Sequence, residues 1–195
     1  MTNTHKIIQA GHYGIELDNY DNYKYDYSFN NAKPVADQKR PIPSPLIAKV
    51  KKNPVDTPEN KVVHDFIWGL CGGLKVTARV KELFEVEGIN AEYVPLEIID
   101  VNGKTIDGEF YTVKALEKHE VFDLDKSTVE MNDDQIFATH TTKLVGKENG
   151  EYKEHLLVIP THLKNRLVMS NDLIEKIEAA GFTNLKATEF SEYTG

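Results

Sequence analysis

The sequence predicts an α+β fold, in which a mostly antiparallel sheet packs against a few helices. Two strand–helix–strand units, over residues 74–97 and 167–190, carry most of this prediction. An Asn102-Gly103 pair adds the signature of a two-residue hairpin turn. The chain has 195 residues, 40% of them hydrophobic, which is enough to build one sizeable core. We therefore expect a single domain over residues 1–195.

The first unit is predicted from its helix signals. Thr77 can cap the helix, because a threonine side chain accepts a hydrogen bond from the first helical turn. Val80 and Phe84 recur at helical spacing and predict the buried face. Gly88 is the expected stop, since glycine readily takes the left-handed conformation that ends many helices. A strand over 93–99 should follow.

Alternating residues predict the next strands. Over 109–115, Tyr111 and Val113 should share one face of a strand that returns from the Asn102-Gly103 turn. Segments 135–145 and 152–159 predict a second hairpin or pair of strands, separated by a charged turn that contains a glycine.

The last unit repeats the plan of the first. Ser170 should cap its helix and Gly181 should end it. When the two units are aligned at a separation of 93 residues, Ser170 aligns with Thr77 and Gly181 with Gly88. The match predicts two similar strand–helix–strand halves that share one core. Two helices that obey the same capping rules would also produce it.

The first 58 residues differ in composition from residues 59–195, which we take as the main α+β core. Residues 1–31 form a Tyr/Asp-rich segment with five of the nine tyrosines, and its alternating part, 23–29, predicts an irregular strand. Residues 32–58 hold six of the eight prolines and several lysines. This composition predicts an extended basic connector across the surface, in which Leu46 to Ala48 could dock as a short strand.

A further helix is expected after this connector. Thr57 can cap it and Pro58 fits its first position. Phe66 and Ile67 belong to an apolar set at helical spacing, and the Gly72-Gly73 pair would end the helix.

The net charge of −8 is unevenly distributed. From Glu85 to Asp134 there are fourteen carboxylates against four lysines, so the rest of the chain is slightly positive. An acidic protein repels phosphate backbones, which argues against nucleic acid as the main partner and suits a basic protein. The simpler interpretation is a solvated acidic face that keeps the protein dissolved.

Two groups of residues are candidates for a partner-binding surface. Tyrosine gives a large contact area at low entropic cost, and carboxylates form a charged rim that attracts a basic partner. The tyrosines could instead pack on the core as one face of a strand. The candidates are Tyr20, Tyr23, Tyr25 and Tyr27 for the anchors, and Asp107, Glu109, Glu117, Glu120 and Asp123 for the rim.

No motif for catalysis, a metal or a cofactor is present. No two histidines have the His-x-x-x-His spacing that places both on one helix face around zinc. His155 and His162 flank an apolar strand and could converge with His140, although exposed histidines at strand ends are the simpler interpretation. We therefore expect a binding protein with no catalytic residues, metal or cofactor. An enzyme with an unfamiliar site, either a small hydrolase or one that acts on nucleotides, is the alternative, as is a general interaction module.

The sequence shows no secretory or membrane-spanning signal, which predicts a cytoplasmic protein. Residues 1–9 carry no long apolar run, and no stretch approaches the roughly 18 consecutive apolar residues of a membrane span. The single cysteine, Cys71, excludes an internal disulfide.

Three stretches together resemble the Imm-eleven family of bacterial immunity proteins. They cover 64–89, 109–130 and 166–190, with an Ile136-Phe137 pair before the last. The family's fold-keeping motifs are matched at Leu124, Asp125, Ser127, Ile136, Phe137, Val168, Ser170, Ala180, Gly181 and Phe190.

The resemblance covers roughly residues 60–193. It implies a cytoplasmic protein that binds and neutralises a cognate toxin of a polymorphic toxin system. It implies no catalytic residues. The oligomeric state does not follow from it.

Overall fold

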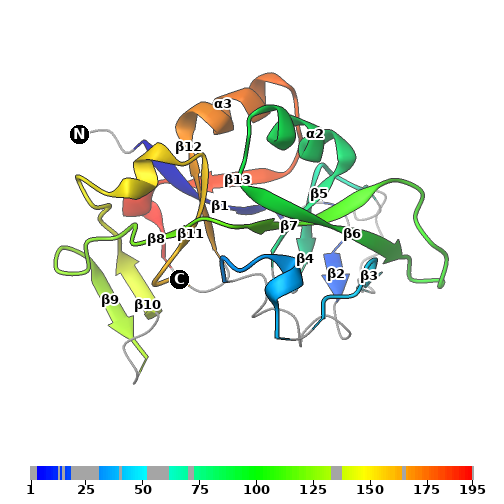
Figure 1. Cartoon of the computed structure of the whole chain (residues 1–195), viewed down its shortest axis with the longest axis horizontal. Helices are drawn as coiled ribbons and strands as arrows, with labels where there is room; N and C mark the ends of the chain where they lie inside the picture. The colour runs from blue at the N-terminus through cyan, green and yellow to red at the C-terminus, as the bar shows by residue number, and fades with distance from the viewer. Residues whose placement is uncertain are drawn as a thin grey trace.

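The computed structural model describes residues 4–12, 14, 16–18, 31–39, 41–51, 62–69, 73–132, 138–163 and 166–194. In this part of the chain the strands form a closed barrel, a five-stranded sheet and a two-stranded sheet, with both α-helices on one side (Figure 1). Eight of the eleven strand pairings described are antiparallel. The α+β prediction is confirmed at this level, whereas the closed barrel was not expected.

The barrel and the sheets draw on strands from the whole chain. The barrel order is β2 (Glu16–Asp18), β3 (Leu46–Val50), β6 (Ala91–Ile99), β7 (Phe110–Ala115), β5 (Leu74–Thr77) and β4 (Phe66–Gly69). The five-stranded sheet has the order β13 (Leu185–Thr188), β1 (His5–Ala10), β12 (Leu167–Ser170), β11 (Leu157–Pro160) and β8 (Lys118–His119). The two-stranded sheet pairs β9 (Thr128–Met131) with β10 (Ala138–Lys143), and the α-helices are α2 (Ala78–Val86) and α3 (Asn171–Ala179).

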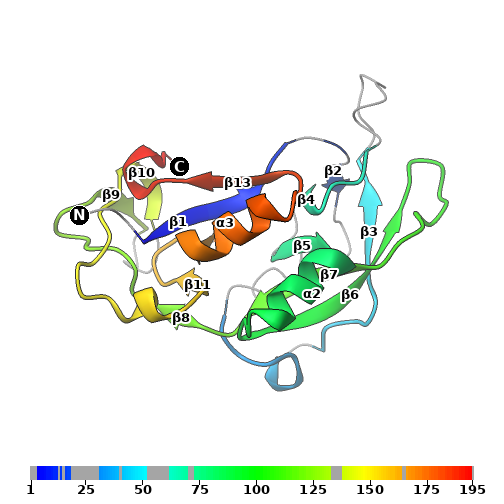
Figure 2. The same cartoon turned by 90° about the horizontal axis from the view of Figure 1, so that it is seen from above.

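The barrel and the five-stranded sheet contain the same three-strand unit. In the unit β5–α2–β6, the two strands are separated by β7, which is antiparallel to both. In the unit β12–α3–β13, the two strands are separated by β1, again antiparallel to both. The two units lie side by side when seen from above (Figure 2). This common plan agrees with the two similar halves expected from the sequence.

Both helices begin and end where their sequence signals place them. The Ser170 side chain accepts a hydrogen bond from the Leu173 backbone N–H at 3.3 Å, as a cap should. Gly88 and Gly181 both have positive φ angles, 69° and 70°, after the last helical turns. Thr77 precedes α2 as expected, but its side chain makes no capping hydrogen bond.

The central core lies between the two α-helices, the barrel and the five-stranded sheet. It takes residues from α2 and α3 and from strands of the barrel and the five-stranded sheet. Successive residues of the five-stranded sheet point into different cores: Ile8 and Met169 face the helices, while Ile7 and Val168 face a second cluster on the other side. Burial of both faces explains why these strands are nearly continuous apolar runs.

The helix expected after Thr57 is wrong in its described part. Phe66–Gly69 forms β4, and Phe66 and Ile67 point into different cores, as neighbours on a strand do. Gly69 explains why the strand fits there: a Cβ atom on it would lie 2.8 Å from the Leu17 Cβ atom of β2. The apolar spacing suited a helix, but β-branched and aromatic residues favour a strand.

The strands predicted within 135–145 and 152–159 are present as β10 and, from Leu157, β11, but they do not pair with each other as a hairpin. β10 pairs with β9 rather than with a strand that starts at Tyr152, and Tyr152 lies in a short 3-10 helix, Glu151–Glu154. The buried strand β11 pairs instead with β12 and β8. Tyr152 is buried under the sheet next to Phe190. An apolar residue at this position therefore reflects packing in the core and not the start of a strand.

The connector 32–58 does more than cross the surface. The short strand expected at Leu46 is present as β3, which pairs with β6 in parallel and with β2 in antiparallel orientation inside the barrel. Earlier in the connector, Val35 donates its backbone N–H to the Glu92 carboxylate at 2.5 Å. The predicted strand 23–29 lies outside the described residues.

A buried carboxylate joins the two halves. Asp65 accepts a hydrogen bond from the Thr77 hydroxyl, 3.0 Å away at the start of α2. Its other oxygen accepts two hydrogen bonds from Thr183, from the backbone N–H at 3.0 Å and from the hydroxyl at 3.1 Å. Arg79 lies 3.6 Å away and adds a positive charge. Because Thr183 follows α3 while Thr77 precedes α2, one side chain ties both helical units together.

A lysine is buried inside the barrel. The Lys114 side chain is fully enclosed and donates a hydrogen bond to the Asn31 carbonyl at 2.7 Å. Desolvation lowers the pKa of Lys114 to about 8, although Glu92 opposes this effect. The folded protein therefore releases this proton at a lower pH than the unfolded chain does.

This lysine predicts a rise in stability with pH. Between about pH 8 and 10 the unfolded chain keeps the Lys114 proton and the folded chain loses it, so the free energy of unfolding should increase. Urea denaturation at several pH values should show this increase in the wild type and a flatter dependence in Lys114→Met. Equal pH dependence in both proteins would contradict the assignment. Above about pH 10 the trend should weaken, because burial raises the pKa of Tyr93 to about 12.

Candidate functional site

The loop between β6 and β7 forms one wall of an open groove. The groove has a volume of about 220 Å³ and lies over the outer surface of the barrel, next to the start of β3. Its apolar walls come from Pro45, Pro95 and Ile106, and its polar atoms include those of Glu97 and Glu109. This is smaller than the roughly 300 Å³ at which small-molecule pockets begin, so the groove suits side chains of a protein partner better than a metabolite.

Asp100 holds the loop in shape. Its carboxylate accepts hydrogen bonds from the backbone N–H groups of Asn102 and Lys104, both at 2.8 Å. These bonds, led by the one from Lys104, lower the pKa of Asp100. Gly103 takes a positive φ of 83°, so the predicted turn forms. An isolated antiparallel bridge joins Ile99 to Thr105 beside the turn. The regular pairing of β6 with β7 begins only at Leu96 and Phe110, so the loop between the two strands is longer than that of a two-residue hairpin.

Two predicted rim residues lie on this loop. Asp107 and Glu109 are exposed, and within the described residues neither forms an ion pair. Glu109 is close to the Tyr111 hydroxyl, at 3.4 Å. On the neighbouring strand, Ile47 is 44% exposed and is the register partner of Glu97. An exposed apolar residue on a strand next to this polar region fits the pattern of an apolar patch with a polar rim.

The other three predicted rim residues lie beyond the far end of β7 and have partners. Glu120 forms an ion pair with Lys147, and Asp123 pairs with Lys126 at 3.0 Å. Glu117 faces two histidines. Glu109 precedes β7 and Glu117 follows it, so these two residues are on the order of 25 Å apart along the strand. The structure therefore divides the predicted acidic surface into two separate groups.

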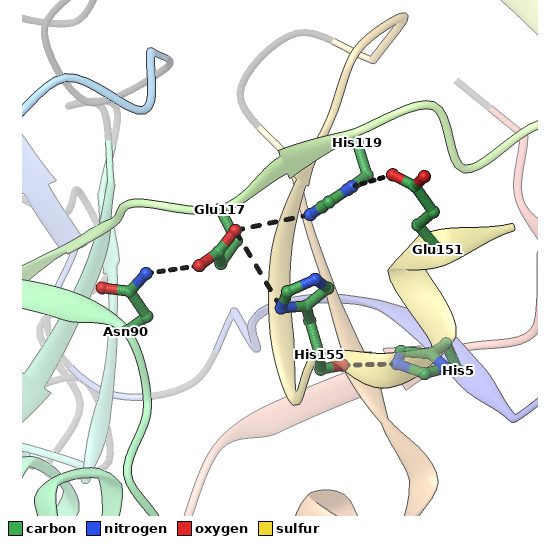
Figure 3. Close-up of polar contacts among 6 residues, drawn as sticks. All are labelled: His5, Asn90, Glu117, His119, Glu151 and His155. Carbon is green, nitrogen blue, oxygen red and sulfur yellow. Dashed lines mark hydrogen bonds and ion pairs between the residues drawn. The ribbon is translucent and has the colours of Figure 1, made fainter.

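Glu117 belongs to a compact polar cluster. His119 and His155 stack with their ring centroids 4.4 Å apart (Figure 3). One Glu117 oxygen, Oε2, lies 3.4 Å from His119 Nε2 and 3.9 Å from His155 Nδ1. All three side chains are partly buried. The cluster forms where β8, which carries His119, runs parallel to β11 just after His155.

Neighbouring side chains orient the members of this cluster. Asn90 donates a hydrogen bond to the other Glu117 oxygen, Oε1, and this bond is the largest cause of the lowered pKa of Glu117. The Glu151 carboxylate lies 3.8 Å from His119 Nδ1, on the ring edge away from Glu117. His5 contacts the His155 carbonyl at 2.7 Å, and burial lowers the pKa of His5. Each partner contacts an atom that faces away from the middle of the cluster.

The sequence did not predict this cluster. It suggested that His155 could meet His140 and His162, but His155 stacks on His119, and His140 is exposed on β10. His119 and His155 come together because β8 pairs in parallel with β11. No local pattern in the sequence predicts this pairing. The candidate anchors Tyr20, Tyr23, Tyr25 and Tyr27 lie outside the described residues.

Ser127 holds a turn that follows Leu124: its hydroxyl donates to the Asp123 carbonyl at 2.6 Å and accepts from the Val145 N–H at 3.0 Å. No helix in the part of the chain that the structure describes is both long and apolar enough to cross a membrane.

Comparison with known proteins gives one family. The model of the immunity protein family Imm11 matches residues 2–192. This match extends the resemblance found in the sequence, which began near residue 60, over nearly the whole chain. No curated protein matches the chain.

Proposed function

Because this chain belongs to the immunity protein family Imm11, we propose that it binds a cognate bacterial toxin and neutralises it by stoichiometric inhibition. In this proposal the protein acts in the cytoplasm of the cell that makes the toxin. The toxin is a basic protein, which an acidic inhibitor attracts over long distances. The choice of surface rests on the groove beside the β6–β7 loop, at which Asp107 and Glu109 form no ion pair with another described residue.

The groove has the composition of a partner-binding surface. Pro45, Pro95 and Ile106 supply apolar area, and Tyr111 supplies an aromatic ring. The exposed Ile47 lies outside the groove, as the register partner of its lining residue Glu97. Asp107 and Glu109 supply negative charge at the rim. A lysine or arginine of the toxin would lay its aliphatic stem on the prolines and bring its charge to the carboxylates. Burial of such an anchor inside a polar rim is how small contact areas reach high affinity.

The fixed shape of the loop supports the same choice. Asp100 binds two backbone N–H groups of the turn, and the Thr105 hydroxyl donates to Glu97 at 2.9 Å. These bonds hold the loop before any partner arrives. A preformed loop loses less conformational entropy on binding, so more of the contact energy appears as affinity.

Co-expression in bacteria tests the proposed function. The gene next to the one encoding this chain should be expressed with and without it. We expect expression of the neighbouring gene alone to stop growth, and co-expression to restore growth and give a complex that co-elutes on a sizing column. A neighbouring product that remains toxic in the presence of this chain would contradict the proposal for that pair.

A further inference from the structure

The Glu117, His119 and His155 cluster has the donor set of a metal site. Two imidazole nitrogens and a carboxylate oxygen are the ligands that Zn²⁺ takes in many proteins. The three ligand atoms lie within 4.8 Å of one another. Bound to one zinc ion with bonds of about 2.0–2.1 Å, tetrahedral ligands would be about 3.3 Å apart. His119 Nε2 and Glu117 Oε2 are already 3.4 Å apart.

The surroundings supply outer partners for two of the three ligands, His119 and Glu117. A ligating histidine usually donates its other ring N–H to a carboxylate or carbonyl, which fixes the tautomer that exposes the ligating nitrogen. Without a metal, the nearest carboxylate oxygen to His119 is Glu117 Oε2, 3.4 Å from Nε2. Once a metal takes the place of a proton on Nε2, the ring proton is held on Nδ1, where the Glu151 carboxylate lies 3.8 Å away. Asn90 binds the Glu117 oxygen that faces away, which leaves Oε2 directed at both histidines (Figure 3).

We propose that Glu117, His119 and His155 bind one divalent transition-metal ion, for which Zn²⁺ is the best fit. The ligand atoms are His119 Nε2, His155 Nδ1 and Glu117 Oε2. The nitrogen-rich donor set disfavours Mg²⁺ and Ca²⁺, which require more oxygen ligands. Three protein ligands leave the fourth tetrahedral position open to water or to a side chain of a partner.

The ion would connect the two parts of the fold. Glu117 follows β7 of the barrel and is held by Asn90, which precedes β6 of the same barrel. His119 and His155 lie at β8 and before β11 of the five-stranded sheet. A bound ion links these parts only in the folded chain, so it should raise the melting temperature. This inference does not depend on binding to a toxin.

Zinc titration of the purified full chain tests the site. Any polyhistidine tag must be removed first, because it binds zinc itself. Calorimetry with Zn²⁺ alone should show one ion per chain, with Mg²⁺ giving no comparable heat. The melting temperature should rise with zinc and fall back when a chelator is added. Co²⁺ in the same site should show the visible bands of a four- or five-coordinate ion.

Matched variants locate the bound ion. His119→Gln and His155→Gln should each weaken zinc binding by more than the roughly 10–100-fold that loss of an outer partner costs. Asn90→Ala should weaken it by about tenfold, because Glu117 loses its orientation. His140→Gln, which removes an exposed histidine of β10, is the control and should leave binding unchanged.

Two results would overturn the proposal. One is the absence of saturable zinc binding to the wild-type chain, a result that does not depend on whether any variant folds. The other is zinc binding that persists unchanged in both His119→Gln and His155→Gln, since the ion would then be adventitious.

Discussion

Replacing Asp65 with alanine is expected to lower the free energy of unfolding by about 3–5 kcal/mol, because each buried group left without its hydrogen-bond partner costs about 1–3 kcal/mol. Three hydrogen bonds end on this carboxylate, one from Thr77 and two from Thr183. Alanine would leave the Thr183 N–H and two hydroxyls without their acceptor. Buried donors without a partner lose the full energy of their interaction with water.

The size of this effect follows from the position of Asp65. The residue is 8% exposed, so water replaces the lost bonds poorly. It also fixes the start of α2 against the segment after α3, and Phe66 next to it donates its backbone N–H to the Thr183 carbonyl at 3.1 Å. The loss should therefore weaken contacts between both helical units rather than one turn.

Urea denaturation followed by circular dichroism measures this prediction. Asp37→Ala is the matched control, because Asp37 is an exposed aspartate in a short 3-10 helix and should change stability by less than about 0.5 kcal/mol. Thr183→Ala, which removes the hydroxyl but keeps the backbone N–H, should lie between the two. An Asp65→Ala protein as stable as Asp37→Ala would show that the network does not hold the halves together.

Reversing the charge of the groove rim is expected to slow association with the toxin by about tenfold or more at low salt. The variant carries Asp107→Lys and Glu109→Lys. Rim charges act mainly on the rate of encounter, because they steer the partner before contact is made. Wild-type association should also slow as salt increases, since exposed charges are screened within about 8–10 Å at physiological ionic strength.

Surface-based kinetics at two salt concentrations provide the measurement. The control is Glu175→Lys with Glu178→Lys, which changes the net charge equally on the exposed side of α3. The control should associate faster than the groove variant. If both variants slow association equally, net charge alone steers the toxin and the groove is not its docking surface.

The sequence correctly predicted the elements whose ends are fixed by residues close to one another in the chain. The helices α2 and α3 lie where capping residues and glycine stops placed them, because these interactions involve residues within a few positions of one another. The barrel was not predicted because its closure depends on β2, β3 and β4, which pair across long stretches of sequence. β4 was predicted as a helix because the apolar spacing at Phe66 suits both structures.

The candidate sites show the same limit. Fourteen acids between Glu85 and Asp134 are close in sequence, but β7 separates Glu109 from Glu117, and side-chain partners engage Glu117, Glu120 and Asp123. A charge count cannot show which carboxylates are already paired. Asp65 gave no sequence signal, because its partners Thr77 and Thr183 are 12 and 118 residues away.

Neutralisation by stoichiometric binding can be tested by a titration of toxin activity. Purified toxin at a concentration well above the dissociation constant should be mixed with increasing amounts of this chain. We predict that toxin activity falls linearly and reaches zero at a fixed ratio, and that the complex of that composition elutes as one species on a sizing column. Complete loss of activity at a small fraction of this ratio, or no loss at any ratio, would contradict the claim.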